Sequence, residues 1–173
     1  MIKNDKIALR TVRIIDFPKI YEWENNPDNW IVSETEKQYT FNEISLLSES
    51  AEDIFETSQL RLIIETNDDS ESIGTLDLFQ ADFDEKSAHI GILIANDKHR
   101  RKGYAQDAIQ LVSEFCAQVL SLDKIYCTIH SFNSASLELF KKCGFQKVEE
   151  GKENPIFDSN SDDVIKMILW LKK

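Results

Sequence analysis

Hydrophobic and polar positions recur along the 173-residue chain in patterns that predict a succession of strands and helices. Compact or alternating apolar runs predict strands, and apolar positions three and four residues apart predict helices that bury one face. The predicted strands are residues 7–12, 60–65, 73–79, 88–94, 124–130, 145–148 and 164–171. The predicted helices are residues 17–23, 40–47, 104–119 and 134–142.

This order predicts an α/β (α+β) fold with a mixed sheet, because strands bracket helices throughout the chain. We expect the last strands to pair antiparallel, since only a loop joins residues 145–148 to residues 164–171. No repeat or long linker divides the chain, so residues 1–173 are expected to form a single domain.

Polar residues mark the ends of the predicted helices. Asp16 stands at the N-cap position of the first helix, and Asn25-Asn26-Pro27 is expected to end that helix. Thr40 and Glu43 have the spacing of a capping box. Gly144 stands just past the helix at residues 134–142, where a left-handed backbone is easiest for glycine.

The most informative stretch is residues 90–108. The apolar run Ile92-Leu93-Ile94 is followed by a basic run at residues 98–102, and Gly103 then opens a long amphipathic helix. A basic loop that ends on a helix N-terminus offers unpaired backbone N–H groups and the positive end of the helix dipole. The pattern therefore predicts an anion site, and phosphate is the usual anion.

Composition narrows the class of protein. The net charge of −11 argues against a nucleic-acid partner and favours a cationic one. Cys116, Cys127 and Cys143 lie within apolar patterns without metal-ligand spacing, so they are interpreted as reduced core thiols, and no metal site is expected. Neither a signal peptide nor a membrane-spanning run is visible, so we expect a cytoplasmic protein that is not bound to a membrane.

Two blocks together resemble the GNAT acetyltransferase superfamily. The acetyl-CoA loop of that family has Arg or Gln, two residues, Gly, one residue, then Gly or Ala, and its second block begins with Asn and closes a helix with Gly-Phe. The matching residues are Arg100, Gly103 and Ala105 in the first block, and Asn133, Ser136, Phe140, Gly144 and Phe145 in the second. The family resemblance implies a mixed, mostly antiparallel central sheet flanked by helices. Within the superfamily, the spermidine/spermine and ribosomal-protein acetyltransferases are most similar.

The resemblance implies a binding site for acetyl-CoA. The backbone of Ile92, Leu93 and Ile94 would bind the pantetheine amides as an added strand would. Backbone N–H groups from Arg101 to Ala105, including Tyr104, would bind the pyrophosphate, because Gly103 lets it approach closely. Arg100, Arg101 and Lys102 would add charge, and Asn133, Ser136 and Phe140 would line the cofactor arm. Asn133 is also expected to cap its helix, and the cap alone is the alternative interpretation.

The implied reaction is attack of an uncharged amine on the thioester carbonyl. An alkylamine is protonated at neutral pH, so a group must accept its proton. Asp77 is the candidate, with His89 and Glu34 as alternatives. Many members of the family have a tyrosine that protonates the leaving thiolate where this chain has Phe140. Tyr104, Tyr126 or water would then fill that role, or the role is unnecessary.

The acceptor implied by the resemblance is a small-molecule amine, in particular a polyamine. Trp30, Glu34 and Asp77 are the expected acceptor-binding residues, because the resemblance implies a polyamine pocket lined with carboxylates, and Trp30 would wall the cleft or else belong to the core. Two alternatives remain open: a protein N-terminus as acceptor, or a module that binds acetyl-CoA without catalysis. A homo-oligomer is also possible.

Overall fold

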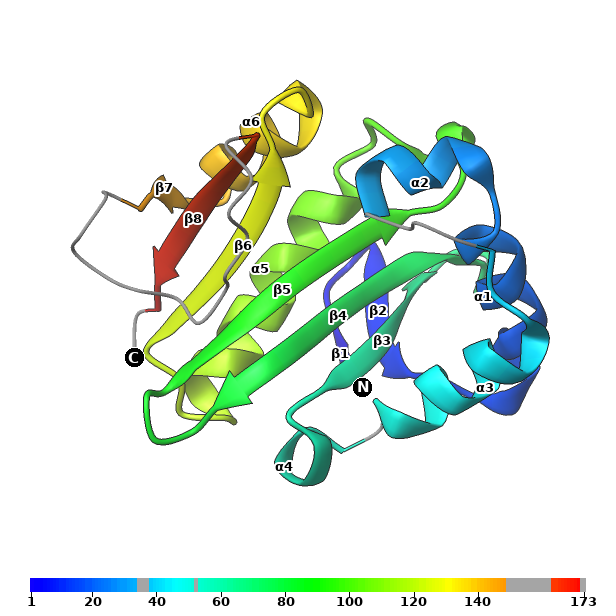
Figure 1. The fold of residues 1–173 in the computed structure, drawn as a ribbon, viewed down its shortest axis with the longest axis horizontal. Helices are drawn as coiled ribbons and strands as arrows, with labels where there is room; N and C mark the ends of the chain where they lie inside the picture. Colours follow the sequence, from blue (N-terminus) through cyan, green and yellow to red (C-terminus); the bar gives the residue numbers. More distant parts are fainter. Residues whose placement is uncertain (34–37, 52, 149–162, 172–173) are drawn as a thin grey trace.

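The computed structural model describes residues 1–33, 38–51, 53–148 and 163–171. Within them, eight strands form one sheet in the order β1-β2-β3-β4-β5-β6-β8-β7 (Figure 1). The strands are β1 (Ile2–Lys3), β2 (Ile7–Thr11), β3 (Leu60–Thr66), β4 (Ser72–Asp82), β5 (Ser87–Ile94), β6 (Lys124–His130), β7 (Gln146–Lys147) and β8 (Val164–Trp170). Among the described strands, β5 and β6 are the only pair that is parallel. The predicted mixed, mostly antiparallel sheet is confirmed.

The helices cover both faces of this sheet. They are α1 (Phe17–Glu24), α2 (Pro27–Ser33), α3 (Phe41–Ser50), α4 (Ile54–Thr57), α5 (Tyr104–Gln118) and α6 (Ser134–Lys142), with 3₁₀ turns η1 (Ile14–Asp16) and η2 (Asp97–His99). The short elements β1, α2 and α4 were not predicted. Asn25 does end α1, but Pro27 begins α2 at once, because proline suits the first position of a helix.

Alternation along β3 assigns the helices to the two faces. Leu62 and Ile64 belong to the main core together with Ala108, Ile109 and Val112 of α5. Ile63 points to the opposite face, because successive strand residues alternate. There it packs in a second cluster with Ile20 of α1 and Ile44 of α3. Thus α5 covers one face of the sheet, and α1 and α3 cover the other.

The two predicted caps behave differently. Thr40 accepts from the Glu43 N–H at 3.2 Å and Glu43 returns a bond to the Thr40 N–H, so the capping box is confirmed. Asp16 occupies the N-cap position of α1 but caps nothing there. Its carboxylate instead accepts from the Arg10 guanidinium at 2.7 and 2.8 Å and from the Arg13 N–H. The ion pair with Arg10 therefore takes the Asp16 carboxylate away from the capping role that the local sequence predicts.

The last two strands do not follow chain order in the sheet. Strand β8 inserts between β6 and β7 and is antiparallel to both, as expected from the loop connection. Gly144 ends α6 with φ +92°, which confirms the predicted left-handed position. Cys116 and Cys127 are buried free thiols, and Cys143 is half-buried. In the described residues, no helix has the length and apolar character required to span a membrane.

Candidate active site

The parallel strands β5 and β6 separate after a short contact. Their pairing extends only from Ser87 with Lys124 to His89 with Tyr126, although β5 continues to Ile94 and β6 to His130. Figure 1 shows the two strands diverging toward their C-terminal ends. The edge of β5 at Ile92, Leu93 and Ile94 is therefore paired with β4 on one side and not with β6 on the other. An extended ligand with amide groups could pair with this edge.

A close approach of β4 holds the other edge of β5 in place. Gly74 lies opposite Ile94, and a Cβ on Gly74 would collide with the backbone carbonyl of Leu93. Glycine is therefore required at this position, which the sequence did not reveal as special. The close contact with β4 thus fixes the backbone of β5 where its other edge diverges from β6.

The loop after β5 leads into α5 through two left-handed residues. Arg101 has φ +61° and Gly103 has φ +89°, and Gly103 is the N-cap of α5. In the described part of the chain, the backbone N–H groups of residues 101–106 donate to no acceptor. A turn with free amides at the N-terminus of a 15-residue helix is suited to binding an anion, and occupation of this turn by a phosphate stays a prediction. The predicted phosphate site has the geometry that it needs.

Most of the basic run is used to hold this loop in place. Lys98 Nζ lies 2.7 Å from Glu71 Oε1, and His99 Nε2 lies 3.3 Å from Glu71 Oε2. The Glu71 pKa is lowered, chiefly by the hydrogen bond from Lys98. By contrast, Arg101 and Lys102 are exposed, and neither pairs with another described residue. These two cations are available to an anion at the free amides.

Arg100 has a structural role that the sequence did not suggest. Its Nε donates to the carbonyl of Ile94 at 2.9 Å, and Nη2 donates to Asn29 Oδ1 at 2.8 Å. Nη1 lies 2.7 Å from Asp97 Oδ1. These contacts use three of the five N–H donors of the guanidinium, so binding of the cofactor by the Arg100 side chain stays a prediction.

The second block forms the start and end of α6. Asn133 accepts from the Ser136 N–H at 3.1 Å, so the predicted cap is confirmed. Phe140 is 4% exposed and packs edge-on against Phe145 with ring centroids 4.9 Å apart. Its ring belongs to the core, which leaves little of its surface for a ligand. Contacts of Asn133, Ser136 and Phe140 with the cofactor stay predictions.

On the face covered by α1, Asp77 belongs to an ion-paired cluster. Asp77 accepts from Arg61 Nε at 2.6 Å and from Nη2 at 3.2 Å, across the register of β3 and β4. Arg61 Nη1 also lies 3.1 Å from Glu24 Oε1 at the end of α1. One guanidinium thus serves two carboxylates, and the cluster carries one excess negative charge when all three groups are ionised.

Glu24 was not among the predicted site residues. Burial raises its pKa, and the nearby Asp77 adds to this, while Arg61 opposes it. The pairing of Asp77 with Arg61 could have been predicted from the sequence. Each is a charged residue within an apolar strand, and the turn at residues 67–70 joins the two strands. The contact of Glu24 with Arg61 could not have been predicted in this way, because it depends on how α1 packs against the sheet.

Trp30 of α2 lies next to this cluster along the chain. Its indole Nε1 donates to the carbonyl of Glu24 at 2.8 Å, and the side chain is half-buried. Glu34 lies outside the described residues. Of the three residues expected to bind the acceptor, Trp30 and Asp77 are therefore linked through Glu24.

His89, the alternative proton acceptor, lies in an aromatic stack. Its ring is 5.6 Å from that of Phe79 and 5.3 Å from that of Tyr126. Burial, with a smaller contribution from Lys166, lowers the pKa of His89 to about 4. A base this weak accepts protons poorly near neutral pH.

Tyr126 and Tyr104 are the two tyrosines named as alternative proton donors to the thiolate. Tyr126 is 5% exposed, and Tyr104 is half-buried at the start of α5.

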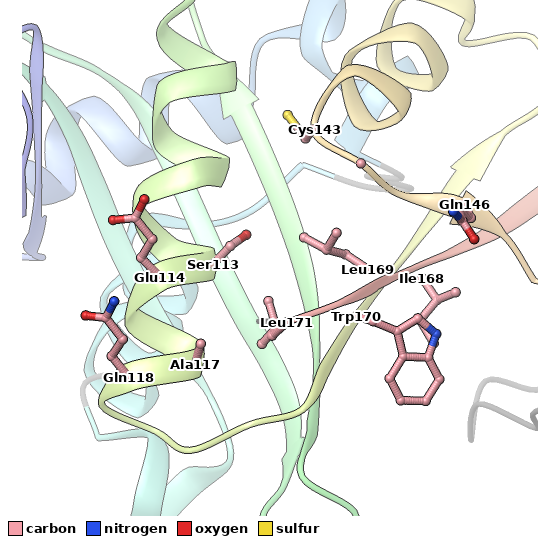
Figure 2. A pocket seen from close by; sticks show the side chains of 11 residues that line it. Ser113, Glu114, Ala117, Gln118, Cys143, Gln146, Ile168, Leu169, Trp170 and Leu171 are labelled. Atoms are coloured by element: carbon pink, nitrogen blue, oxygen red, sulfur yellow. The ribbon is translucent and has the colours of Figure 1, made fainter. Parts of the chain in front are cut away.

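A groove lies elsewhere on the molecule (Figure 2). It has a volume of about 480 Å³ and is formed by α5, the end of α6 and β8. Its lining includes Ser113, Leu169 and Trp170, and none of the predicted site residues belongs to it. The groove is therefore separate from the predicted site.

Comparison with known proteins identifies the class. The family model of the acetyltransferase (GNAT) domain matches residues 6–146. The chain therefore belongs to the GNAT acetyltransferase family, and it is an N-acetyltransferase that uses acetyl-CoA.

Individual relatives cover nearly the whole chain. Spermidine N(1)-acetyltransferase of Vibrio cholerae is 27% identical over 172 residues, which is 98% of this chain and 96% of the relative. An uncharacterised N-acetyltransferase of Bacillus subtilis is 28% identical over 148 residues, covering 85% and 83%. The crystal structure of spermidine N-acetyltransferase from Vibrio cholerae in complex with CoA and spermine has a TM-score of 0.82 at 24% identity, covering 97% of each chain, and shares the fold.

The residues present fit acetyl-CoA. Apart from its chain neighbours, a Cβ on Gly103 would meet only Lys6 Nζ among the described residues within 4 Å, at 3.9 Å, so little protein surrounds the α-carbon of this turn. Phosphates require such amides and nearby cations, which residues 101–106 supply. The pantetheine arm could pair with a strand edge that no described strand occupies, which β5 supplies beyond His89.

Proposed function

We propose that this enzyme transfers the acetyl group of acetyl-CoA to a primary amine of a polyamine such as spermidine. The observation that carries the proposal is the Glu24–Arg61–Asp77 cluster, with two carboxylates on one guanidinium. A cationic amine would neutralise the excess negative charge of this cluster. The net charge of −11 and the similarity to a spermidine N(1)-acetyltransferase also support a cationic acceptor.

In the proposed reaction both substrates are bound together. The uncharged amine attacks the thioester carbonyl, a C–N bond forms, the C–S bond breaks, and CoA leaves as a thiolate. Asp77 accepts the proton of the amine, directly or through water. Both Asp77 oxygens accept from Arg61, but an ionised carboxylate has about four acceptor sites, so capacity remains for a proton.

The chain's own residues would hold the donor. Free amides at residues 101–106 with Arg101 and Lys102 would bind the diphosphate, and the β5 edge at Ile92 to Ile94 would bind the pantetheine amides. Phe140 cannot protonate the thiolate. A thiol with a pKa of about 8.5 can depart as a thiolate without prior protonation. We therefore propose that activity is lower than with a tyrosine at this position but is not abolished.

The deciding experiment is release of free CoA thiol from acetyl-CoA with a panel of acceptors. We expect the highest kcat/KM with spermidine or spermine and little release with simple monoamines or with peptides. A peptide N-terminus as the best acceptor would favour the ribosomal-protein type of activity instead. Binding of CoA without thiol release for any amine would mark a non-catalytic module.

We further propose that the enzyme assembles as a homo-oligomer. The structure of a similar spermidine N-acetyltransferase from Vibrio cholerae, with a TM-score of 0.74 at 24% identity over 97% and 95% of the two chains, is dodecameric. Exposed Ile14 and Ile15, at 82% and 79%, offer apolar surface for such contacts. Light scattering after gel filtration tests this, and a mass of one chain, 20.0 kDa, would refute it.

A further inference from the structure

Lys6 reaches the start of α5 from the turn between β1 and β2. Its Nζ lies 3.3 Å from Asp107 Oδ2, in the first turn of the helix. The turn is firmly held: Asn4 Oδ1 accepts from the N–H groups of Lys6 and Ile7 at 2.9 Å. Asn67 also donates its N–H to the carbonyl of Lys6 at 2.9 Å. The position of the Lys6 backbone is therefore fixed relative to the sheet.

The Lys6 ammonium borders the space beside the free amides. Among the described residues, chain neighbours aside, it is the one atom within 4 Å of the position that a Cβ would take on Gly103. The side chain remains 60% exposed. An ammonium has three N–H donors, so the contact with Asp107 leaves others for a second acceptor.

Asp107 makes a cation at this position necessary. Its Oδ2 is buried and accepts no hydrogen bond from a described residue, so the Lys6 ammonium at 3.3 Å is its ion-pair partner, and the Asp107 side chain is 20% exposed. A bare carboxylate here would lie close to a bound phosphate and repel it. Lys6 offsets that charge while adding a donor on the open side.

We propose that Lys6 is a phosphate-binding residue of the acetyl-CoA site, supplied by the N-terminal hairpin in addition to Arg101 and Lys102. This inference rests on the binding of the donor at residues 101–106 that is part of the proposed function. Lys6 binds a phosphate oxygen of CoA, in the diphosphate or at the 3′ position. The local basic run gave no indication of this residue, which precedes Arg101 by 95 positions.

The test is the Kd of CoA by titration calorimetry for the wild type, Lys6→Gln and Lys3→Gln. Lys3 is an exposed lysine of β1 and serves as the matched control. We expect Lys6→Gln to raise Kd about fivefold to twentyfold, as loss of a partly exposed charge-assisted hydrogen bond should. Lys3→Gln should stay within about twofold. Lys6→Gln with Asp107→Asn should recover part of the loss, because the repelling carboxylate is then gone.

Titration with 3′-dephospho-CoA locates the contact. An effect of Lys6→Gln that persists places Lys6 at the diphosphate, and one that disappears places it at the 3′-phosphate. Equal Kd values for Lys6→Gln and Lys3→Gln with CoA would overturn the inference, as would a wild type that does not bind CoA. The wild type could instead bind CoA, with weaker binding by Lys6→Gln, and acetylate no amine. That result would refute the proposed function and leave the inference about Lys6 standing. Thermal unfolding checks that the variants fold, because Lys6→Gln leaves the buried Asp107 Oδ2 without its ion-pair partner.

Discussion

Arg100 donates a hydrogen bond from Nη2 to Asn29 Oδ1 at 2.8 Å and thereby joins the loop after β5 to α2. Asn29 is fully buried, and its Nδ2 donates to the carbonyl of Trp23 in α1. The loop that is proposed to hold the donor is thus connected to the helices beside the acidic cluster. Arg100, which matches the family motif, makes this connection with its side chain.

Replacement of Arg100 by Met is expected to destabilise the fold. Asn29 Oδ1 would lose its partner while buried, which costs about 1–3 kcal/mol. Urea unfolding of Arg100→Met, Asn29→Leu and the double variant measures this, and we expect the double variant to lose less than the sum of the single ones. Additive losses would contradict the connection. Arg101→Met, at an exposed side chain, is the control and should change stability by about 0.5 kcal/mol or less.

Gly103→Ala is expected to weaken CoA binding by at least about tenfold. The residue has φ +89°, where an L side chain costs about 1–2 kcal/mol, and relief of that strain would move the free amides. Gly144→Ala is a matched control, since Gly144 has φ +92° but lies at the end of α6. Both variants should lose stability, and only Gly103→Ala should raise the Kd of CoA in calorimetry. Equal Kd values for the two variants would argue against a phosphate site at this turn.

Asp77→Asn is expected to lower kcat for polyamine acetylation by about 10²-fold or more, because a carboxamide cannot accept the proton. The Kd of CoA should not change. The variant is compared with Glu24→Gln, which removes the other carboxylate on Arg61. Both are assayed below their unfolding temperatures, since an unpaired buried guanidinium lowers stability. Full turnover by Asp77→Asn across the pH range would exclude Asp77 as the proton acceptor.

His89 is expected to make stability depend on pH. Its pKa is about 4 in the folded protein, below the ordinary value of 6.5, chiefly because of burial. The unfolded chain therefore binds more protons between these values. The contribution of His89 is complete above pH 6.5 and is lost as the pH falls toward 4, by about 3 kcal/mol in total. Chemical unfolding at pH 7, 5.5 and 4.5 should show a smaller loss for His89→Gln than for the wild type. Parallel losses would contradict the assignment.

Phe140→Tyr tests whether the role of proton donor to the thiolate is vacant. We expect kcat to rise by at least about tenfold, because general acid catalysis of this kind contributes about 10²–10⁴-fold. Phe140 is 4% exposed, so a loss of stability is checked separately by thermal unfolding. An unchanged kcat in a folded variant would show that thiolate departure does not need an acid here.

Local patterns predicted much of the fold and of the donor site. The strands, the capping box of Thr40 and Glu43, the cap at Asn133 and the turn at Gly103 each depend on residues close in sequence. The contacts that give the site its character join distant residues, such as Arg100 with Asn29 and Lys6 with Asp107. No periodicity encodes such pairs. The role of Asp16 was changed in the same way, because Arg10 from β2 binds its carboxylate.

The central claim is that the diphosphate of acetyl-CoA binds the backbone amides of residues 101–106. Amide NMR spectra of ¹⁵N-labelled protein during titration with CoA test it most directly. We predict that the resonances of residues 101–106 shift most, whereas pantetheine, which lacks the phosphates, shifts only those of β5 residues such as Ile92 and Leu93. Shifts confined to the groove at Ser113 and Leu169, with residues 101–106 unchanged, would contradict the account.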